Sequence, residues 1–162
     1  MGRRFVSLSL YWLGSVADRR NDVAAAKAYF AESHAISEQL ARNDPANDKR
    51  QIELMLVLPH VGETAAAAAI ADRFATHPEL DNELRVDMAR CYVQCARSLP
   101  TERGDDAKRF RAKAVQILRD AIANGYSDRV ALATEPDLAP LAEDAEFVAA
   151  LAAIPQKIPH NN

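Results

Sequence analysis

The sequence between residues 48 and 76 constrains the fold more than any other stretch. Six of the seven residues from 52 to 58 are Ile, Leu, Met or Val, so a helix there has almost no polar face. Such a helix is buried on several sides. After a break at Pro59–Gly62, residues 65–74 begin with five consecutive alanines, which favour helix and let a neighbouring backbone approach closely. The stretch therefore predicts a helical hairpin in the middle of a stack of helices.

The composition favours an all-α protein. The 162 residues are 49% hydrophobic but only 6% aromatic, which is typical of helices packed through small side chains rather than of a β-sandwich. The formal net charge of -3 argues against a nucleic-acid partner. Two cysteines do not form a disulfide framework and suit a reducing compartment.

No segment of the sequence predicts insertion into or export across a membrane. No run reaches about 18 uninterrupted apolar residues, the minimum for a spanning helix. The first residues lack the pattern of a secretory signal, because serines and a glycine interrupt the apolar segment and no cleavage site follows. We therefore expect a cytoplasmic protein with no membrane partner.

Apolar periodicity predicts a helical hairpin on each side of the central one. The first covers about residues 5–42, with Leu10, Leu13, Gly14 and Ala17 on the inward face of its first helix. The third covers about residues 81–125. Its first helix has a clean apolar face, and Gly125 ends its second helix in the left-handed conformation.

The remaining residues differ from the hairpins. Ser127 is expected to cap a short helix, residues 135–141 to form a turn fixed by two prolines, and residues 144–154 to form a last helix. Residues 155–162 are expected to be a disordered tail.

The three hairpins resemble tetratricopeptide repeats. That pattern places a glycine in the first helix 12 positions before an alanine in the second. The same spacing separates Gly14 from Ala26 and Met55 from Ala67. We expect this spacing to seat each alanine against the residue of the first helix. Met55 and Ala89 are 34 residues apart, which is the usual repeat length, although about 13 residues are inserted in the third hairpin. The resemblance implies a right-handed α-α superhelix of about three hairpins over residues 1–126, closed by cap helices at 127–154 through Phe147 and Leu151.

A narrower resemblance covers the C-terminal half. Asp87-x-Ala89-Arg-Cys91-Tyr92, then residues 111–126, then Glu135-Pro136-Asp137-Leu138-x-Pro140-Leu141 and Phe147 look like the C-terminal end of large bacterial serine/threonine kinases with tetratricopeptide repeats. The resemblance implies that the chain is the tail of a larger signalling protein. No kinase motif is present in these residues, so any kinase activity would belong to an upstream domain.

The repeat resemblance also implies a concave groove that binds peptides. In such stacks the first helices of successive hairpins line the groove. Transferring that face by helical phase predicts the following groove residues: Tyr11, Ser15, Asp18 and Arg19; Lys49, Ile52, Leu56 and His60; Val86, Arg90 and Gln94. The alternative is that the C-terminal segment or a neighbouring repeat fills the groove.

The sequence predicts no catalytic or metal site and no cofactor. Cys91 and Cys95 lie one helical turn apart and could share a metal or form a redox pair, but both fall on an apolar face, where cysteine is usually a small buried hydrophobe. The four histidines are scattered without metal-ligand spacing. Acidic pairs at 105–106 and 143–144 stand where helices begin and complement the helix dipole. The basic cluster of Arg3, Arg4, Arg19 and Arg20 suits a solvated face better than an anion site.

These observations favour a non-catalytic protein-interaction module whose partner is unknown. The alternative is a structural module that self-associates through an exposed N-terminal flank formed by Phe5, Leu8 and Trp12, because large exposed apolar patches mark such contacts. An enzyme with an unrecognised helical site, using His60 or Arg90, is a third and weaker hypothesis.

Overall fold

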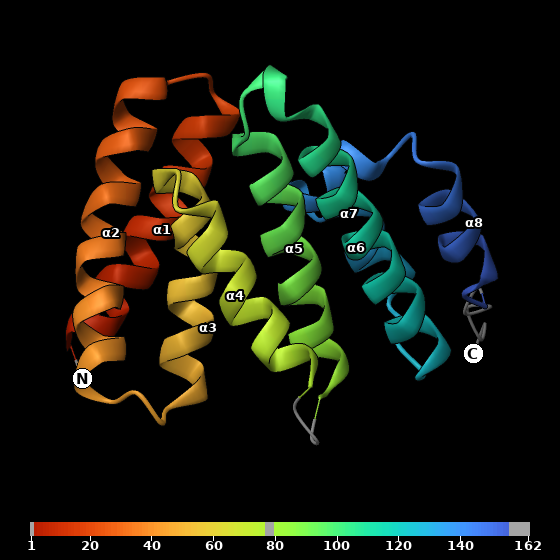
Figure 1. The fold of residues 1–162 in the computed structure, drawn as a ribbon, viewed down its shortest axis with the longest axis horizontal. Helices are drawn as coiled ribbons and strands as arrows, with labels where there is room; N and C mark the ends of the chain where they lie inside the picture. The colour runs from red at the N-terminus through yellow and green to blue at the C-terminus, as the bar shows by residue number, and fades with distance from the viewer. Residues whose placement is uncertain (1, 77–79, 156–162) are drawn as a thin grey trace, which may run out of the picture. The chain divides into compact units, whose positions relative to one another are not determined.

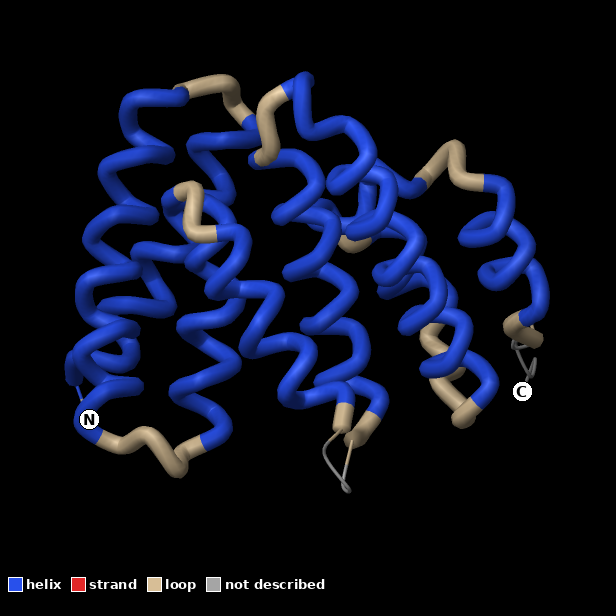
Figure 2. Tube along the Cα trace, viewed as in Figure 1, coloured by secondary structure: helices blue, strands red, loops and turns tan. Residues whose placement is uncertain are grey.

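The computed structural model describes residues 2–76 and 80–155, and within these two ranges every regular element is a helix (Figures 1 and 2). This agrees with the all-α class expected from the composition. The chain divides into two compact units, residues 1–76 and residues 77–162. No helix in the described ranges is long and apolar enough to cross a membrane.

The first unit consists of four α-helices joined by short turns. They are α1 (Gly2–Arg19), α2 (Val23–Asn43), α3 (Asp48–Val57) and α4 (Thr64–Ala75), with the 3-10 helix η1 (Leu58–Val61) between α3 and α4. Each α-helix packs against the next one along the chain, which Figure 1 shows for α1 and α2. The predicted first hairpin, about residues 5–42, covers α1 and α2, and the predicted second hairpin, residues 48–76, covers α3 and α4.

Local chemistry sets the helix ends in this unit. The Asp22 carboxylate accepts a hydrogen bond of 3.1 Å from the backbone N–H of Ala25, which caps α2 as expected for a short acidic side chain. The α-helical conformation of α3 stops two residues before Pro59, which has no backbone N–H to donate. Gly62 then takes a φ of 85°, a left-handed conformation that glycine adopts without strain.

Small side chains let α1 and α2 approach closely. A Cβ placed on Gly14 would lie 2.9 Å from two ring carbons of Phe30, so Phe30 occupies the space that a side chain at position 14 would need. We expected Ala26 to take this place. Ala26 is also buried, but the three atoms nearest to the Gly14 position all belong to the Phe30 ring.

Three serines form the contact between α1 and α2 nearer the start of α1. The Ser7 hydroxyl lies 2.7 Å from the Ser37 hydroxyl and donates to the backbone carbonyl of Ser33 at 3.1 Å. The Ser33 hydroxyl donates in return to the carbonyl of Ser7 at 2.9 Å. These buried hydroxyl groups are satisfied across the interface, so the two helices pack closely without the cost of unpaired polar atoms.

We expect Gly14→Ala to lower the free energy of unfolding by about 1–3 kcal/mol, because the added methyl group overlaps the buried Phe30 ring. Chemical denaturation followed by circular dichroism measures the change. Gly104→Ala is the control, since nothing lies within 4 Å of a Cβ there and its φ is ordinary. Equal stability of the Gly14→Ala and Gly104→Ala proteins would contradict the steric role of Gly14.

The second unit contains a long helical pair and three shorter elements. The pair is α5 (Asn82–Ser98) and α6 (Gly104–Ala123), joined through η2 (Thr101–Arg103). After α6 come α7 (Arg129–Thr134), the 3-10 helix η3 (Pro136–Leu141) and α8 (Ala145–Ala153). Helix α5 packs against α6 and η3, and α8 packs against α6 and α7.

The core of the second unit lies between α5 and α6. Every residue of α5 from Met88 to Ala96 is buried, including Cys91 and Cys95, which is the core placement expected for the two thiols. Across from them, Ala114, Leu118 and Ala121 of α6 are also buried. Gly125 ends α6 at a φ of 91°, as its position after the apolar pattern predicted.

Four details differ from the sequence predictions. Helix α1 begins at Gly2 rather than at Phe5, and Leu13 is 47% exposed rather than inward. Helix α7 is capped by Asp128, whose carboxylate accepts from the N–H of Ala131 at 2.9 Å, and not by Ser127. Residues 136–141, predicted as part of a turn fixed by two prolines, form a 3-10 helix. The expected tail lies outside the described residues apart from Pro155.

Candidate functional site

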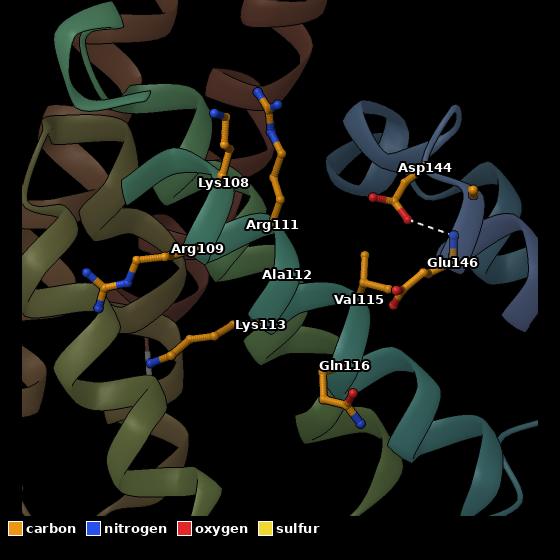
Figure 3. Close-up of a pocket in the computed structure, with 10 residues that line it drawn as sticks. Lys108, Arg109, Arg111, Ala112, Lys113, Val115, Gln116, Asp144 and Glu146 are labelled. Atoms are coloured by element: carbon orange, nitrogen blue, oxygen red, sulfur yellow. Dashed lines mark hydrogen bonds between the residues drawn. The ribbon is translucent and has the colours of Figure 1, made fainter. Parts of the chain in front are cut away.

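The second unit contains a cleft between α6 and α8 (Figure 3). The part of the cleft beside the first residues of α8 has a volume of about 820 Å³. The α6 wall is lined by Lys108, Arg111 and Val115, and the opposite wall by the first residues of α8 and their cap. None of the groove residues predicted from the sequence lines this cleft.

The α6 wall of the cleft is cationic. Lys108 and Arg111 extend from the same side of α6, while Arg109 and Lys113 extend from another side (Figure 3). Lys108 pairs with the exposed Asp105 at 3.4 Å, an arrangement that contributes little to stability in water. Arg111 is exposed and has no ion pair among the residues that the structure describes. This wall therefore keeps positive charge that a ligand can use.

The carboxylates of the opposite wall are already engaged. Asp144 caps α8 by accepting hydrogen bonds of 3.0 Å from the backbone N–H groups of Glu146 and Phe147. Glu146 accepts a hydrogen bond of 3.1 Å from Arg119 across the cleft. The acidic pair at 143–144 thus stands at a helix start, as predicted, with Asp144 as the capping residue. The electrostatic balance of the cleft consequently favours an anionic ligand.

A second cavity of about 510 Å³ continues the cleft toward the C-terminal ends of α6 and α8. Glu146 lines both cavities. Ile122 and Ala123 form the α6 wall there, and Ala149, Ala150 and Ala153 form the α8 wall. From Lys108 to Ala123 the cleft follows about 22 Å of helix α6, given a rise of about 1.5 Å per residue. It is cationic at one end and apolar at the other.

The predicted groove residues lie elsewhere and in both units. In the first unit, Tyr11 and Ser15 are buried, Asp18, Ile52, Leu56 and His60 are half-buried, and Arg19 and Lys49 are exposed. The structure brings Tyr11 and His60 together, with ring centroids 5.7 Å apart, and stacks His60 on Phe30 at 3.8 Å. Tyr11 and Phe30 belong to the apolar core of the unit, and the half-buried His60 ring packs against both.

In the second unit, Val86 is half-buried, whereas Arg90 and Gln94 are buried beneath η3. Asp137 of η3 accepts hydrogen bonds from Arg90 Nε at 3.1 Å and from Arg90 Nη2 at 2.8 Å. Its other oxygen accepts from Gln94 Nε2 at 3.1 Å. The C-terminal segment of the chain therefore covers Arg90 and Gln94. A groove filled by this segment was one of the alternatives that the sequence left open.

Arg90 is shared by three carboxylates. Besides Asp137, it donates to Asp87 at 3.0 Å and lies 3.6 Å from Glu135. Burial raises the pKa of the Asp87 carboxyl above its ordinary value, and the nearby Arg90 guanidinium opposes this shift without cancelling it. The cluster holds η3 against α5 by charge as well as by the buried Leu138 and Leu141.

The described residues hold no cluster of three or more His, Cys, Asp or Glu that could bind a metal ion. A scan against family models, a search of the curated proteins and a search of the solved structures find no match for this chain. The interpretation of the site accordingly rests on the geometry of the residues described above.

We expect Asp137→Ala to lower the free energy of unfolding by about 3–5 kcal/mol, because the buried Arg90 loses its main partner. Urea denaturation followed by circular dichroism measures the effect. Asp105→Ala is the control, since the pair of Asp105 with Lys108 is largely exposed and its loss should change stability by less than about 1 kcal/mol. A loss no larger than that of the control would show that the cluster does not hold η3.

Asp87 gives a pH-dependent prediction. Because its pKa is raised, the folded protein binds this proton more tightly than the unfolded chain does. The contribution of the Asp87 carboxyl to the free energy of unfolding is therefore greatest below the ordinary carboxyl pKa. It falls as pH rises through the raised pKa of Asp87. We expect the stability of Asp87→Asn relative to the wild type to increase between about pH 4 and pH 7. Denaturation curves across this range would contradict the assignment if the difference were constant.

Proposed function

We propose that this chain is a non-catalytic protein-interaction module that binds a peptide segment of a partner protein in the cleft between α6 and α8. The observation that carries the proposal is the cleft itself, which combines a cationic end at Lys108 and Arg111 with an apolar end between Ile122 and the alanines of α8. Peptide-recognition grooves typically combine apolar pockets with a few charged groups that fix register.

The dimensions and chemistry of the cleft specify the kind of segment. About 22 Å of helix accommodates six or seven extended residues, or about four turns of a helix. Acidic side chains of the segment would face Lys108 and Arg111. Apolar side chains would pack between α6 and α8, where the alanine side chains leave room for them.

The repeat resemblance supports a broader form of the same proposal. The groove of such repeats is lined by the first helices of the hairpins, so the cleft on α6 would be an additional peptide-binding surface of the same kind of protein. The resemblance of residues 87–147 to the ends of bacterial serine/threonine kinases supports a role as the interaction tail of a larger signalling chain. The size of the native polypeptide, measured by immunoblot in its source cells, tests that role, and a band near 17.8 kDa would contradict it.

Selection from a library of displayed peptides tests the proposal. We expect enriched peptides to combine acidic and apolar residues, and to bind at least about 10-fold more weakly to Arg111→Glu and to Ala149→Trp, which reverse the charge and fill the cleft. Fluorescence anisotropy with labelled peptides measures the affinities.

Two variants on α2 serve as matched controls for this experiment. Lys27→Glu reverses an exposed charge, and Ala31→Trp adds the same bulk to an exposed alanine of the first unit. Both should bind the selected peptides as the wild type does. Peptides that bind the Ala149→Trp protein with unchanged affinity, or a library that yields no enriched sequence, would overturn the cleft as the binding site.

A further inference from the structure

Helix α1 carries an apolar stripe on the side that faces away from α2. The stripe consists of Phe5, Val6, Trp12 and Leu13, which are 61%, 50%, 54% and 47% exposed. The exposed Ser9 lies at its centre. Phe5, Val6, Trp12 and Leu13 make up more than half of the large hydrophobic residues that are exposed in the described part of the chain. The self-association flank predicted from the sequence included Leu8, but Leu8 is half-buried at the margin of the stripe.

The stripe has an internal symmetry about Ser9. Phe5 and Leu13 stand four residues from Ser9 on either side, and Val6 and Trp12 stand three residues from it. With about 100° of rotation per residue, Phe5 and Trp12 fall on one side of the line through Ser9, and Val6 and Leu13 fall on the other. The stripe therefore has an aromatic side, formed by Phe5 and Trp12, and an aliphatic side, formed by Val6 and Leu13.

We propose that α1 pairs with α1 of a second copy of this chain, antiparallel, across a two-fold axis at Ser9. A two-fold axis there sets Phe5 of each copy beside Trp12 of the other, and Val6 of each copy beside Leu13 of the other. Aromatic side chains then meet aromatic ones and aliphatic side chains meet aliphatic ones. Ser9 meets its own copy at the centre, where its small size lets the two helices cross closely. An isologous dimer requires such a self-complementary surface.

The area of the stripe is consistent with a dimer. With half-exposed side chains contributing about 100 Å² each, the four apolar residues offer on the order of 400 Å² per copy, or about 800 Å² in the pair. Homodimer interfaces are about 65% apolar, so this corresponds to roughly 1,200 Å² of total buried surface, the lower limit of the standard range. A concentration-dependent dimer, rather than a permanent one, is the expected result.

A cysteine at the proposed axis tests the register. Interaxial distances of about 8–10 Å bring the two Cα atoms at the crossing within disulfide reach. We expect Ser9→Cys to form an intermolecular disulfide under mild oxidation, whereas Arg3→Cys, about 18 Å from its own copy in this register, should not. Cys91 and Cys95 are buried and serve as an internal background in both proteins. Disulfide formation by Arg3→Cys that equals that of Ser9→Cys would overturn the proposed register.

Substitutions that introduce a charge into the stripe test the pairing itself. Analytical ultracentrifugation measures the fraction of dimer at each protein concentration. We expect the wild type to dimerise with increasing concentration and Trp12→Glu to remain monomeric. Val130→Glu, at a valine outside the stripe that is 71% exposed, should dimerise as the wild type does. Circular dichroism checks that each variant folds, which is expected because these side chains are exposed.

Paired charges make the test specific to the proposed contacts. Val6→Lys/Leu13→Glu places opposite charges beside each other across the axis and should dimerise, whereas Val6→Glu/Leu13→Glu places like charges there and should not. A wild type that stays monomeric at all concentrations would overturn the proposal and leave the stripe to a different partner. A dimer that neither Trp12→Glu nor Val6→Glu/Leu13→Glu weakens would also overturn the proposal.

Discussion

The close approach of antiparallel helices is the constraint on which each unit depends. In the first unit, Gly14 makes room for the Phe30 ring, and serines from both helices exchange hydrogen bonds where a larger residue would separate them. In the second unit, Ala89, Ala114 and Ala121 are fully buried between α5 and α6. Small residues at a contact bring backbones together and increase dispersion contacts along the pair. The many alanines of the sequence therefore serve to bring the paired helices close together.

Buried charge determines where the C-terminal segment lies. A guanidinium taken out of water must be compensated by several acceptors, and Arg90 finds them in Asp87 of its own helix and in Asp137 and Glu135 of the segment that enters η3. This requirement fixes η3 on α5, with Leu138 and Leu141 buried beside the charges. From η3 the chain returns to α6 as α8, whose alanine-rich side fills the space beside α6 incompletely. The cleft is therefore a consequence of how the segment is held and of how little bulk α8 carries.

Features set by interactions within a few residues could be predicted from the sequence. Features set by contacts between distant parts of the chain could not. Apolar periodicity, Pro59, Gly62 and Gly125 placed the long helices, because capping and turn chemistry are local. The partner of Arg90 lies 47 residues away in the sequence, and the pattern gave no reason to choose Asp137 over other carboxylates. Leu13 was misplaced because an apolar residue at helical spacing can lie on the outer stripe as easily as in the core. The run of cations at 108–113 and the alanines of α8 were the available signals for the cleft, but only the packing of α8 against α6 combines them.

The two proposed binding surfaces differ in the physics of recognition, and this would give them separable roles. The α1 stripe is apolar and its positions are symmetric about Ser9, so it would suit a copy of itself, and its pairing would not be weakened by charge screening. The cleft is cationic at one end, so the proposed affinity for an acidic segment would fall as ionic strength rises. A dimer formed through α1 would carry two such clefts. A partner with two acidic segments could then bind more tightly than either cleft alone allows, by a factor set by the linker between the segments. Self-association and peptide binding would thus reinforce each other without a contact between the two surfaces.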